Sequence, residues 1–401
     1  MTPSWPWRLE CSECRATATP DGLPTVCAAC GAPWLVEYER LPAPADPRVH
    51  SEERRVQSAG PDPSLAPRPS PWSMWRYRDW LPLRDGEEPV TLGEGMTPLL
   101  RMPGLERRYG LRALWIKDES KNPTGSFKAR GLAMAVTRAA LAGAPAFTVP
   151  TAGNAGVALS AYACRAGIPA RVYAPRMTPD TLLAQVRAFG ATLELVDGHI
   201  GDCGRLSRAH AATTGAFDVS TLREPYRIEG KKTLGLELAE QLAWSLPDVI
   251  VYPAGGGTGL IGMWKAFREL ARAGWLPDTL PRFFAAQSTG CAPLVRAVET
   301  GATRTEPWPD PKTVASGLCV PAPLGGALML RAIRESGGGA VAVSDEALCA
   351  AQRELAAGHG IDAAPEGGAG LAALEELHRR GVVGPTDCVV VFNTGAGWLY
   401  R

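Results

Sequence analysis

The sequence has 401 residues, a formal net charge of +1 and ten cysteines. This length allows more than one hydrophobic core, so we expect two or three domains. The balanced charge gives no electrostatic support for binding to nucleic acid or to a membrane surface, and no apolar run is long enough to span a bilayer. The first residues, MTPSWPWRLE, lack the features of a signal peptide, so a cytoplasmic location is expected.

Four of the cysteines form two closely spaced pairs near the start of the chain. Cys11 and Cys14 belong to CSEC, and Cys27 and Cys30 belong to CAAC, twelve residues further on. This spacing is typical of a zinc ribbon, in which each pair supplies two thiolates to one ion. Two disulfides are the alternative, which a reducing compartment disfavours. We therefore predict a zinc-ribbon-like module over residues 1–40 with one structural Zn²⁺ ion, because a Cys₄ site leaves no coordination position for catalysis.

Residues 41–71 are rich in proline, serine and charge, and this composition predicts a linker. After it, short apolar strands alternate with helical segments of ten to fifteen residues, a pattern that predicts βαβ units and parallel sheets. Strands are expected at 113–119, 146–151, 170–175, 192–198, 248–254, 282–288 and 387–395, and helices at 127–144, 154–167, 178–190, 230–244, 258–274, 344–358 and 367–380.

Three glycine-rich turns each follow an expected strand and precede an expected helix. They are NPTGSFK (122–128), PTAGNAG (150–156) and YPAGGGTGLIG (252–262). In α/β proteins ligands collect at such turns, at the carboxyl ends of the strands. The third turn can direct several backbone N–H groups at a phosphate, with the helix dipole behind them. Its spacing matches neither the P-loop nor the dinucleotide-binding pattern.

Lys128 stands in the first turn of an expected helix, with Ser126 at the N-cap position. The positive end of the helix dipole disfavours an ammonium group there and favours the neutral, nucleophilic amine. A surface lysine is the alternative interpretation. A nucleophilic lysine together with a phosphate-binding turn suggests pyridoxal phosphate held as a Schiff base.

The segment NPTGSFKARG resembles the Schiff-base segment of the fold type II (tryptophan-synthase-β-like) pyridoxal-phosphate enzymes, most closely the threonine synthase family. WRYRDWLPL (75–83), TLGEGMTPL (91–99) and PYRIEGKKT (225–233) resemble further segments of that family, some members of which carry an N-terminal Cys₄ module. The resemblance implies an α/β fold of two doubly wound domains, a large one over 72–134 and 223–401 and a small one over 135–222. It also implies a homodimer that converts O-phospho-L-homoserine and water to L-threonine and phosphate.

The resemblance also assigns roles to individual residues. Lys128 would hold the cofactor and move protons, Asn154 would contact the cofactor's 3′-oxygen, and Thr394 would meet its pyridine nitrogen. The other expected cofactor-binding residues are Phe127, Gly255, Gly256, Gly257, Thr258 and Gly259. Thr151, Ala152 and Gly153 would bind the substrate carboxylate. For the substrate phosphate we expect Arg223, Arg227 and Lys231, because these residues, like Lys232, can supply positive charge; a solvated helix start is the alternative interpretation of this cluster.

The sequence departs from the family pattern on the substrate side. Ala129 replaces the usual aspartate, Glu224 stands where a neutral phosphate ligand is often found, and NTGAGWLYR replaces the usual terminal segment. A threonine or serine dehydratase, or another β-replacement enzyme, is therefore an alternative. A zinc-ribbon binding protein without catalysis is a third hypothesis, which the intact Lys128, Asn154, glycine turn and Thr394 oppose.

Overall fold

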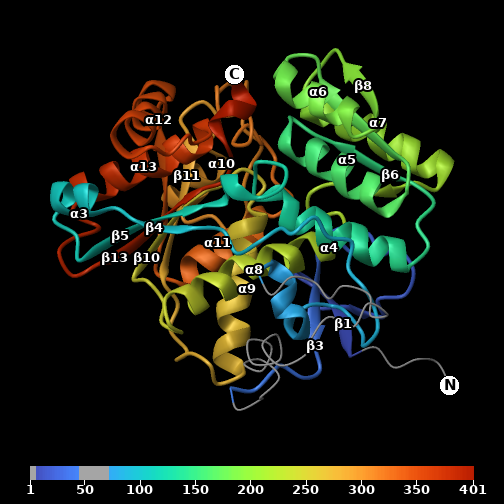
Figure 1. Ribbon diagram of the computed structural model, residues 1–401, viewed down its shortest axis with the longest axis horizontal. Helices are drawn as coiled ribbons and strands as arrows, with labels where there is room; N and C mark the ends of the chain where they lie inside the picture. The colour runs from blue at the N-terminus through green and yellow to red at the C-terminus, as the bar shows by residue number, and fades with distance from the viewer. Residues whose placement is uncertain (1–5, 45–71) are drawn as a thin grey trace, which may run out of the picture.

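The computed structural model describes residues 6–44 and 72–401, so most of the expected linker lies outside the described residues. The described chain forms three sheets, of six, four and three strands. Figure 1 shows the six-stranded and four-stranded sheets in two α/β halves that lie side by side. Among the described residues, no helix is both long and apolar enough to cross a membrane.

The six-stranded sheet has the order β12-β11-β10-β13-β5-β4, and its strands are parallel except β4, which runs antiparallel to β5. Its central strand β10 reads VIVYP and is buried throughout, as expected for a parallel sheet covered on both faces. The strands are β4 (Leu99–Arg101), β5 (Ala113–Asp118), β10 (Val249–Pro253), β11 (Arg282–Ser288), β12 (Gly339–Val343) and β13 (Cys388–Asn393).

Two layers of helices cover this sheet. Ile250 and Tyr252 pack in one core with α8, α9 and α11, whereas Val249 and Val251 pack in another with α3, α12 and α13. This alternation follows from the two-residue period of a strand. The helices of this half are α3 (Pro103–Tyr109), α8 (Tyr226–Gln241), α9 (Thr258–Arg272), α10 (Pro293–Glu299), α11 (Gly326–Glu335), α12 (Asp345–His359) and α13 (Pro365–Arg379).

The four-stranded sheet has the order β8-β7-β6-β9 and is parallel throughout. Helix α4 (Lys128–Leu141) contacts both α5 of this half and α8 of the other, so it lies at their boundary. The remaining elements of this half are β6 (Phe147–Pro150), α5 (Asn154–Ala166), β7 (Ala170–Pro175), α6 (Asp180–Ala188), β8 (Thr192–Val196), α7 (Ile200–Thr214) and β9 (Phe217–Asp218).

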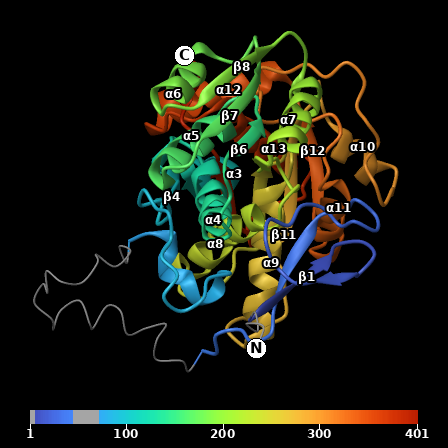
Figure 2. The same ribbon diagram turned by 90° about the vertical axis from the view of Figure 1, so that its right-hand side faces the viewer.

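The N-terminal residues form a small antiparallel sheet of β1 (Trp7–Cys11), β2 (Thr17–Ala18) and β3 (Trp34–Tyr38). Figure 2 shows it beside the body of the molecule, near α9 and α11. Trp7 and Leu9 share a core with residues of α4, and the Tyr38 hydroxyl donates a hydrogen bond to Glu229 of α8 at 2.5 Å. The module is therefore packed against the two helices that meet at the boundary.

Three expectations about the helices and strands need correction. Ser126 is not the N-cap of α4: it pairs with Gly395 in an isolated β-bridge, and Phe127 precedes the first helical residue. Helix α8 begins at Tyr226, before the expected start at residue 230. Helices α3, α7, α10 and α11 and strands β4, β9 and β12 were not among the expected elements. Helix α7 contains poor helix formers, and β12 is a short edge strand that begins with glycine.

Candidate active site

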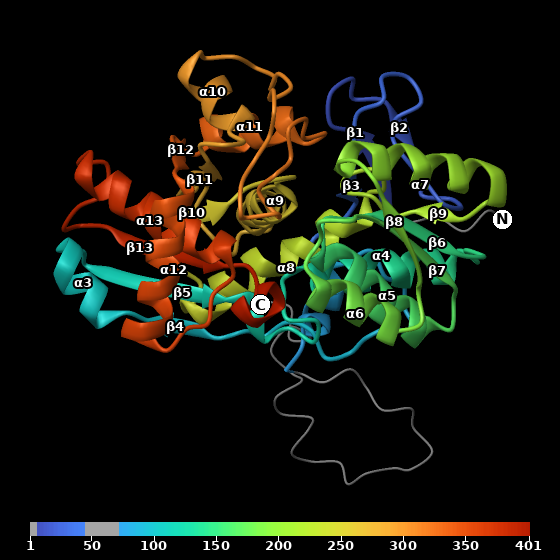
Figure 3. The same ribbon diagram turned by 90° about the horizontal axis from the view of Figure 1, so that it is seen from above.

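The three glycine-rich turns meet at a cavity of about 370 Å³ that is lined by residues from both α/β halves. Seen from above in Figure 3, the two halves flank the region where the chain ends in η3 (Gly397–Tyr400). The expected site residues that line the cavity are Phe127, Lys128, Thr151, Ala152, Gly153, Asn154, Arg223, Gly255, Gly256, Gly257, Thr258 and Thr394.

Lys128 is the first residue of α4 and lies in the cavity wall. Burial, together with the positive charge of Arg227, lowers the pKa of its ammonium to about 7, although Glu366 opposes the shift. Its Nζ atom lies 4.5 Å from the centre of the Phe127 ring. A large fraction of this lysine is therefore a neutral amine near pH 7, which is the nucleophilic form.

Three expected site residues lie outside the cavity wall. Arg227 and Lys231 are buried in α8: Arg227 donates to the Val219 carbonyl at 2.7 Å, and Lys231 donates to the Phe127 carbonyl. Lys231 Nζ also lies 3.9 Å from the centre of the Phe127 ring. Gly259 packs against the Tyr252 hydroxyl. The two side chains lie behind the first turn of α4, where Arg227 acts on Lys128 through its charge.

The third glycine turn leads into α9, with Gly257 at the N-cap in the left-handed region (φ +76°). A Cβ atom at Gly256 would come within 2.9 Å of Thr221, and one at Gly257 would overlap Met329. Close packing therefore requires glycine at these positions. Among the described residues, none accepts a hydrogen bond from the backbone N–H groups of 255–259. These donors, at a helix N-terminus, form a site that fits a phosphate.

The second glycine turn leads into α5, and Gly153 has a φ of +142° there. The Thr151 hydroxyl accepts hydrogen bonds from the N–H groups of Gly153 and Gly156, at 2.9 and 3.1 Å, which holds the turn in shape. The N–H groups of Ala152, Asn154 and Ala155 have no acceptor among the described residues. Their arrangement suits a carboxylate.

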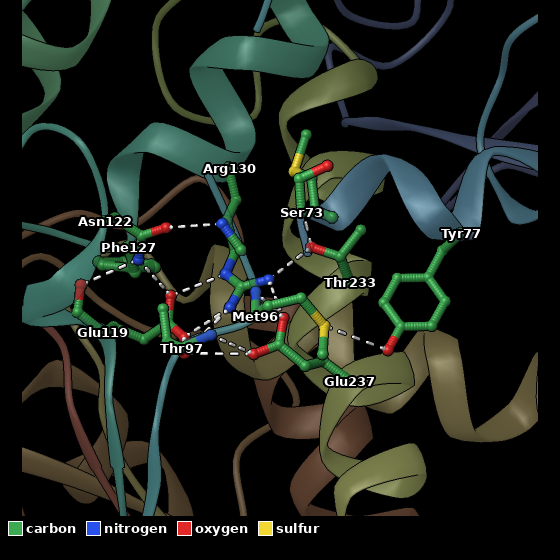
Figure 4. A network of polar contacts seen from close by, with 12 residues as sticks. Ser73, Tyr77, Met96, Thr97, Glu119, Asn122, Phe127, Arg130, Thr233 and Glu237 are labelled. Atoms are coloured by element: carbon green, nitrogen blue, oxygen red, sulfur yellow. Dashed lines mark hydrogen bonds and ion pairs between the residues drawn. The ribbon is translucent and has the colours of Figure 1, made fainter. Parts of the chain in front are cut away.

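A buried ionic network supports the first turn of α4 (Figure 4). The Arg130 guanidinium donates to both carboxylate oxygens of Glu119, each at 2.7 Å, and to Glu237 at 2.8 Å. Lys117 also pairs with Glu237, and the four side chains are fully buried. Burial by itself would raise the pKa of Glu237, but the charges of Arg130 and Lys117 lower it to about 2. The network ties α4 to β5 and α8, two residues from Lys128.

Glu224, the most conspicuous departure from the family pattern, faces away from the cavity wall. Its carboxylate accepts the N–H groups of Tyr226 at 2.7 Å and Arg227 at 3.1 Å, so it caps α8 and explains the early start of that helix. Burial raises its pKa to about 7. The acidic residue is thus used at the positive end of a helix dipole.

Several residues in the cavity wall were not among the expected site residues. Arg208 of α7 lies close enough to Arg223 to lower the pKa of the latter, which burial also lowers. Residues 316–324 form another part of the wall, and Gly317 donates its N–H to Glu366 at 2.7 Å. Tyr400 accepts a hydrogen bond from Asn154 at 3.0 Å. The sequence signal for Tyr400 is the unusual terminal segment NTGAGWLYR; Arg208, on an unpredicted helix, had none.

The four paired cysteines converge, as their spacing predicts. All are free thiols, and their sulfur atoms lie within 4.8 Å of one another. The Sγ–Sγ distances are 3.4 Å for Cys11 and Cys30 and 3.7 Å for Cys14 and Cys27. Four thiols in one cluster are a ligand set suited to Zn²⁺.

The residues of the cavity fit pyridoxal phosphate. A lysine amine with a pKa near 7 lines the same cavity as unpaired N–H groups at a helix N-terminus, and the buried Asn154 Oδ1 atom has no hydrogen-bond partner among the described residues. Fold and site together define a fold type II pyridoxal-phosphate enzyme. Residues 90–395 match the family model described as pyridoxal-phosphate dependent enzyme.

Comparisons with known proteins define the family further. The chain is 34% identical over 390 residues to threonine synthase of Methanosarcina acetivorans, covering 97% of this chain and 91% of the relative. It is 35% identical to threonine synthase of Mycobacterium bovis, over 84% of this chain and 90% of the relative. The chain belongs to the threonine synthase family.

Solved structures resemble the fold over about three quarters of the chain. Maize serine racemase aligns with a TM-score of 0.66 and 23% identity, covering 75% of this chain and 88% of that one. A fungal L-serine ammonia-lyase from Rhizomucor miehei aligns with a TM-score of 0.64 and 24% identity, covering 75% and 93%. The fold is therefore shared with enzymes that are named for different activities.

Proposed function

We propose that this protein is a threonine synthase that converts O-phospho-L-homoserine and water to L-threonine and inorganic phosphate. The observation that carries the proposal is Lys128, an amine with a pKa near 7 that shares one cavity with two sets of unpaired backbone N–H groups. One set suits the phosphate of a cofactor, and the other suits the carboxylate of an amino acid. Family membership supports the same activity.

Each part of the cavity has a role in this proposal. Lys128 would hold the cofactor, with Phe127 beside it, and the backbone of Gly255, Gly256, Gly257 and Thr258 would hold its phosphate. Asn154 contacts its 3′-oxygen, and Thr394 contacts its pyridine nitrogen. Bound pyridoxal phosphate supplies an electron sink that stabilises negative charge formed on the substrate. The backbone of residues 151–153 binds the substrate carboxylate.

Lys128 would also move the protons of the reaction, once the substrate amine has displaced it from the cofactor. Its freed neutral amine would remove a proton from the substrate α-carbon and then help to remove one from the β-carbon, so that phosphate leaves from the γ-carbon. Water adds at the β-carbon, and protons return to the γ- and α-carbons. An amine with a pKa near 7 suits both directions of transfer, because the ideal acid or base has a pKa close to the working pH.

The substrate phosphate is assigned to Arg223 together with Arg208. Both residues line the cavity, and burial together with the positive charge of Arg208 lowers the pKa of Arg223. An anion bound between them relieves the repulsion between the two positive charges and forms charge-assisted hydrogen bonds. Arg227 and Lys231, whose charge made them candidate phosphate ligands in the sequence, are assigned other roles, because both are buried behind α4. Arg227 lowers the pKa of Lys128, and Lys231 supports Phe127 through its carbonyl.

The remaining assignments concern the rest of the molecule. The Cys11, Cys14, Cys27 and Cys30 cluster binds one structural Zn²⁺ ion in a zinc-ribbon-like module. The large domain comprises 72–134 and 223–401, and the small domain 135–222. The enzyme is a cytoplasmic homodimer.

Phosphate and L-threonine are measured together after O-phospho-L-homoserine is added to the purified protein with pyridoxal phosphate. Equal release of both products is expected from the wild type, and none from Lys128→Ala. Lys121→Ala removes a lysine that is 63% exposed, and it serves as the matched control with wild-type turnover. Formation of a 2-oxo acid and ammonia from threonine, without turnover of the phosphorylated substrate, would replace this proposal with a dehydratase.

A further inference from the structure

The last residues of the sequence run across the boundary between the two α/β halves. On one side, Gly397 donates its N–H to the Asp362 carbonyl at 2.8 Å, and Arg401 pairs with the Asp362 carboxylate at 2.7 Å. On the other side, the Thr181 hydroxyl of α6 donates to the Arg401 carbonyl at 2.5 Å. Figures 1 and 3 both place this end of the chain between the two halves. We name residues 397–401 the C-terminal strap.

The strap also lies directly on the turn that precedes Lys128. Ala396, next to the strap, donates its N–H to the Gly125 carbonyl at 2.8 Å. Side-chain atoms of Trp398 and Leu399 lie 3.1 and 3.0 Å from the position that a Cβ atom on Gly125 would occupy. The strap is thus in contact with the Schiff-base turn as well as with both halves of the molecule.

Tyr400 directs a polar group from the strap into the cavity. Its hydroxyl accepts the Asn154 amide at 3.0 Å and lies beside the Glu366 carboxyl and Ser316, and all four residues line the cavity. Burial and then the negative charge of Glu366 raise the pKa of this tyrosine well above its ordinary value, so the hydroxyl keeps its proton. It can therefore donate to Glu366 while accepting from Asn154.

Asn154 directly follows a turn, so a hydrogen bond to Tyr400 can fix the orientation of its side-chain amide. It is the first residue of α5, directly after the left-handed Gly153, and its own Oδ1 atom has no hydrogen-bond partner among the described residues. Glu366, in contrast, is fixed by the N–H of Gly317 and by its place at the start of α13. Tyr400 therefore lies between Asn154 on one half of the molecule and Glu366 on the other.

We propose that Tyr400 is a positioning residue of the active site: its hydroxyl, which reaches across the boundary between the two halves, orients the Asn154 amide toward the cofactor ring. The proposal rests on the proposed function, because it takes Asn154 as the ligand of the cofactor's 3′-oxygen. Packing alone does not explain this residue, since a phenylalanine would fill the same space without a hydroxyl that joins cavity-lining polar groups.

The test compares the wild type with Tyr400→Phe. Loss of one neutral hydrogen bond is expected to weaken the affinity for pyridoxal phosphate by about three- to tenfold, measured by absorbance titration. A less well oriented Asn154 also gives less support to negative charge on the 3′-oxygen, so the pH midpoint of the bound cofactor's visible band is expected to rise. The matched control is Tyr109→Phe, because the buried Tyr109 hydroxyl has no partner among the described residues.

A double-mutant cycle separates positioning from general stability. In an Asn154→Ala background, Tyr400→Phe is expected to cause no further change in affinity or in the pH midpoint, because the group it orients is gone. Equal effects of Tyr400→Phe in both backgrounds, or wild-type values in the single variant, would overturn the proposal. If the wild type itself takes up no pyridoxal phosphate, the proposed function fails first and the inference fails with it; wild-type uptake with an unchanged variant refutes the inference alone.

Discussion

Replacing Arg130 by methionine tests whether the buried ionic network stabilises the fold around Lys128. The guanidinium donates two hydrogen bonds to Glu119 and one to Glu237, with all three side chains fully buried. Methionine fills much of the space but leaves Glu119 with the neutral donors of Thr97 and Asn122. Breaking a buried ion pair from one side costs about 3–5 kcal/mol, so we expect a loss of that size in the free energy of unfolding at pH 7.5.

The pH dependence gives a second, independent check. In the wild type the pKa of Glu237 is about 2, below its unfolded value of about 4.3, so its contribution is present above that unfolded value and is lost as the pH falls toward 2. In Arg130→Met the guanidinium no longer opposes the effect of burial on Glu119. Burial therefore raises the pKa of Glu119 above its unfolded value. As the pH falls, protonation of Glu119 removes the cost of its buried, unpaired charge in the variant. The difference in the free energy of unfolding between the variant and the wild type is therefore expected to become smaller from pH 7.5 to pH 5.

Urea denaturation of both proteins without cofactor measures these differences. Arg268→Met is the matched control, because Arg268 is 49% exposed and its pair with Glu335 is worth about 0–1 kcal/mol. The role assigned to the network would be refuted by either of two results. One is a loss of unfolding free energy in Arg130→Met no larger than that of the control, and the other is a difference from the wild type that grows toward pH 5.

Three further predictions concern single groups. In the cofactor-free protein the Lys128 amine is expected to react with an acylating reagent with a midpoint near pH 7, because only the neutral amine reacts; peptide mass spectrometry over a pH series checks this, and a midpoint near 10 contradicts it. Glu224 has a folded pKa of about 7, above its unfolded value, so its ionised carboxylate costs stability only at high pH. In thermal denaturation, Glu224→Gln is therefore expected to be more stable than the wild type at pH 8.5 but not at pH 5. Glu224→Ala loses the cap and about 0.5–2 kcal/mol of stability. Removal of metal by a chelator is expected to release one Zn²⁺ per chain and lower the melting temperature, and a metal-free protein with an unchanged melting temperature would contradict the structural ion.

Local sequence carried much of the fold and the centre of the site. Strands β10 and β13 are continuous apolar runs, and the glycine turns that follow strands indicate where a parallel sheet binds ligands. These signals are local, so they indicate Lys128 and the glycine turn as candidates without knowledge of the rest of the chain, whereas Asn154 was assigned by the family resemblance. The cysteine spacing likewise predicts the cluster that the four thiols form.

Tertiary structure decided which charged residues reach the cavity. Arg223, Arg227 and Lys231 all stand within one short segment, yet the helix that begins at Tyr226 buries the last two behind α4, because side chains on one helix face different directions. Tyr400 reaches Asn154 from 246 positions away in sequence, through a strap that no local pattern indicates. The sequence by itself thus determined the candidate amine and the glycine turn that we propose for the cofactor phosphate. The wall around them is assembled from residues distant in the chain, so only the packed fold could place it.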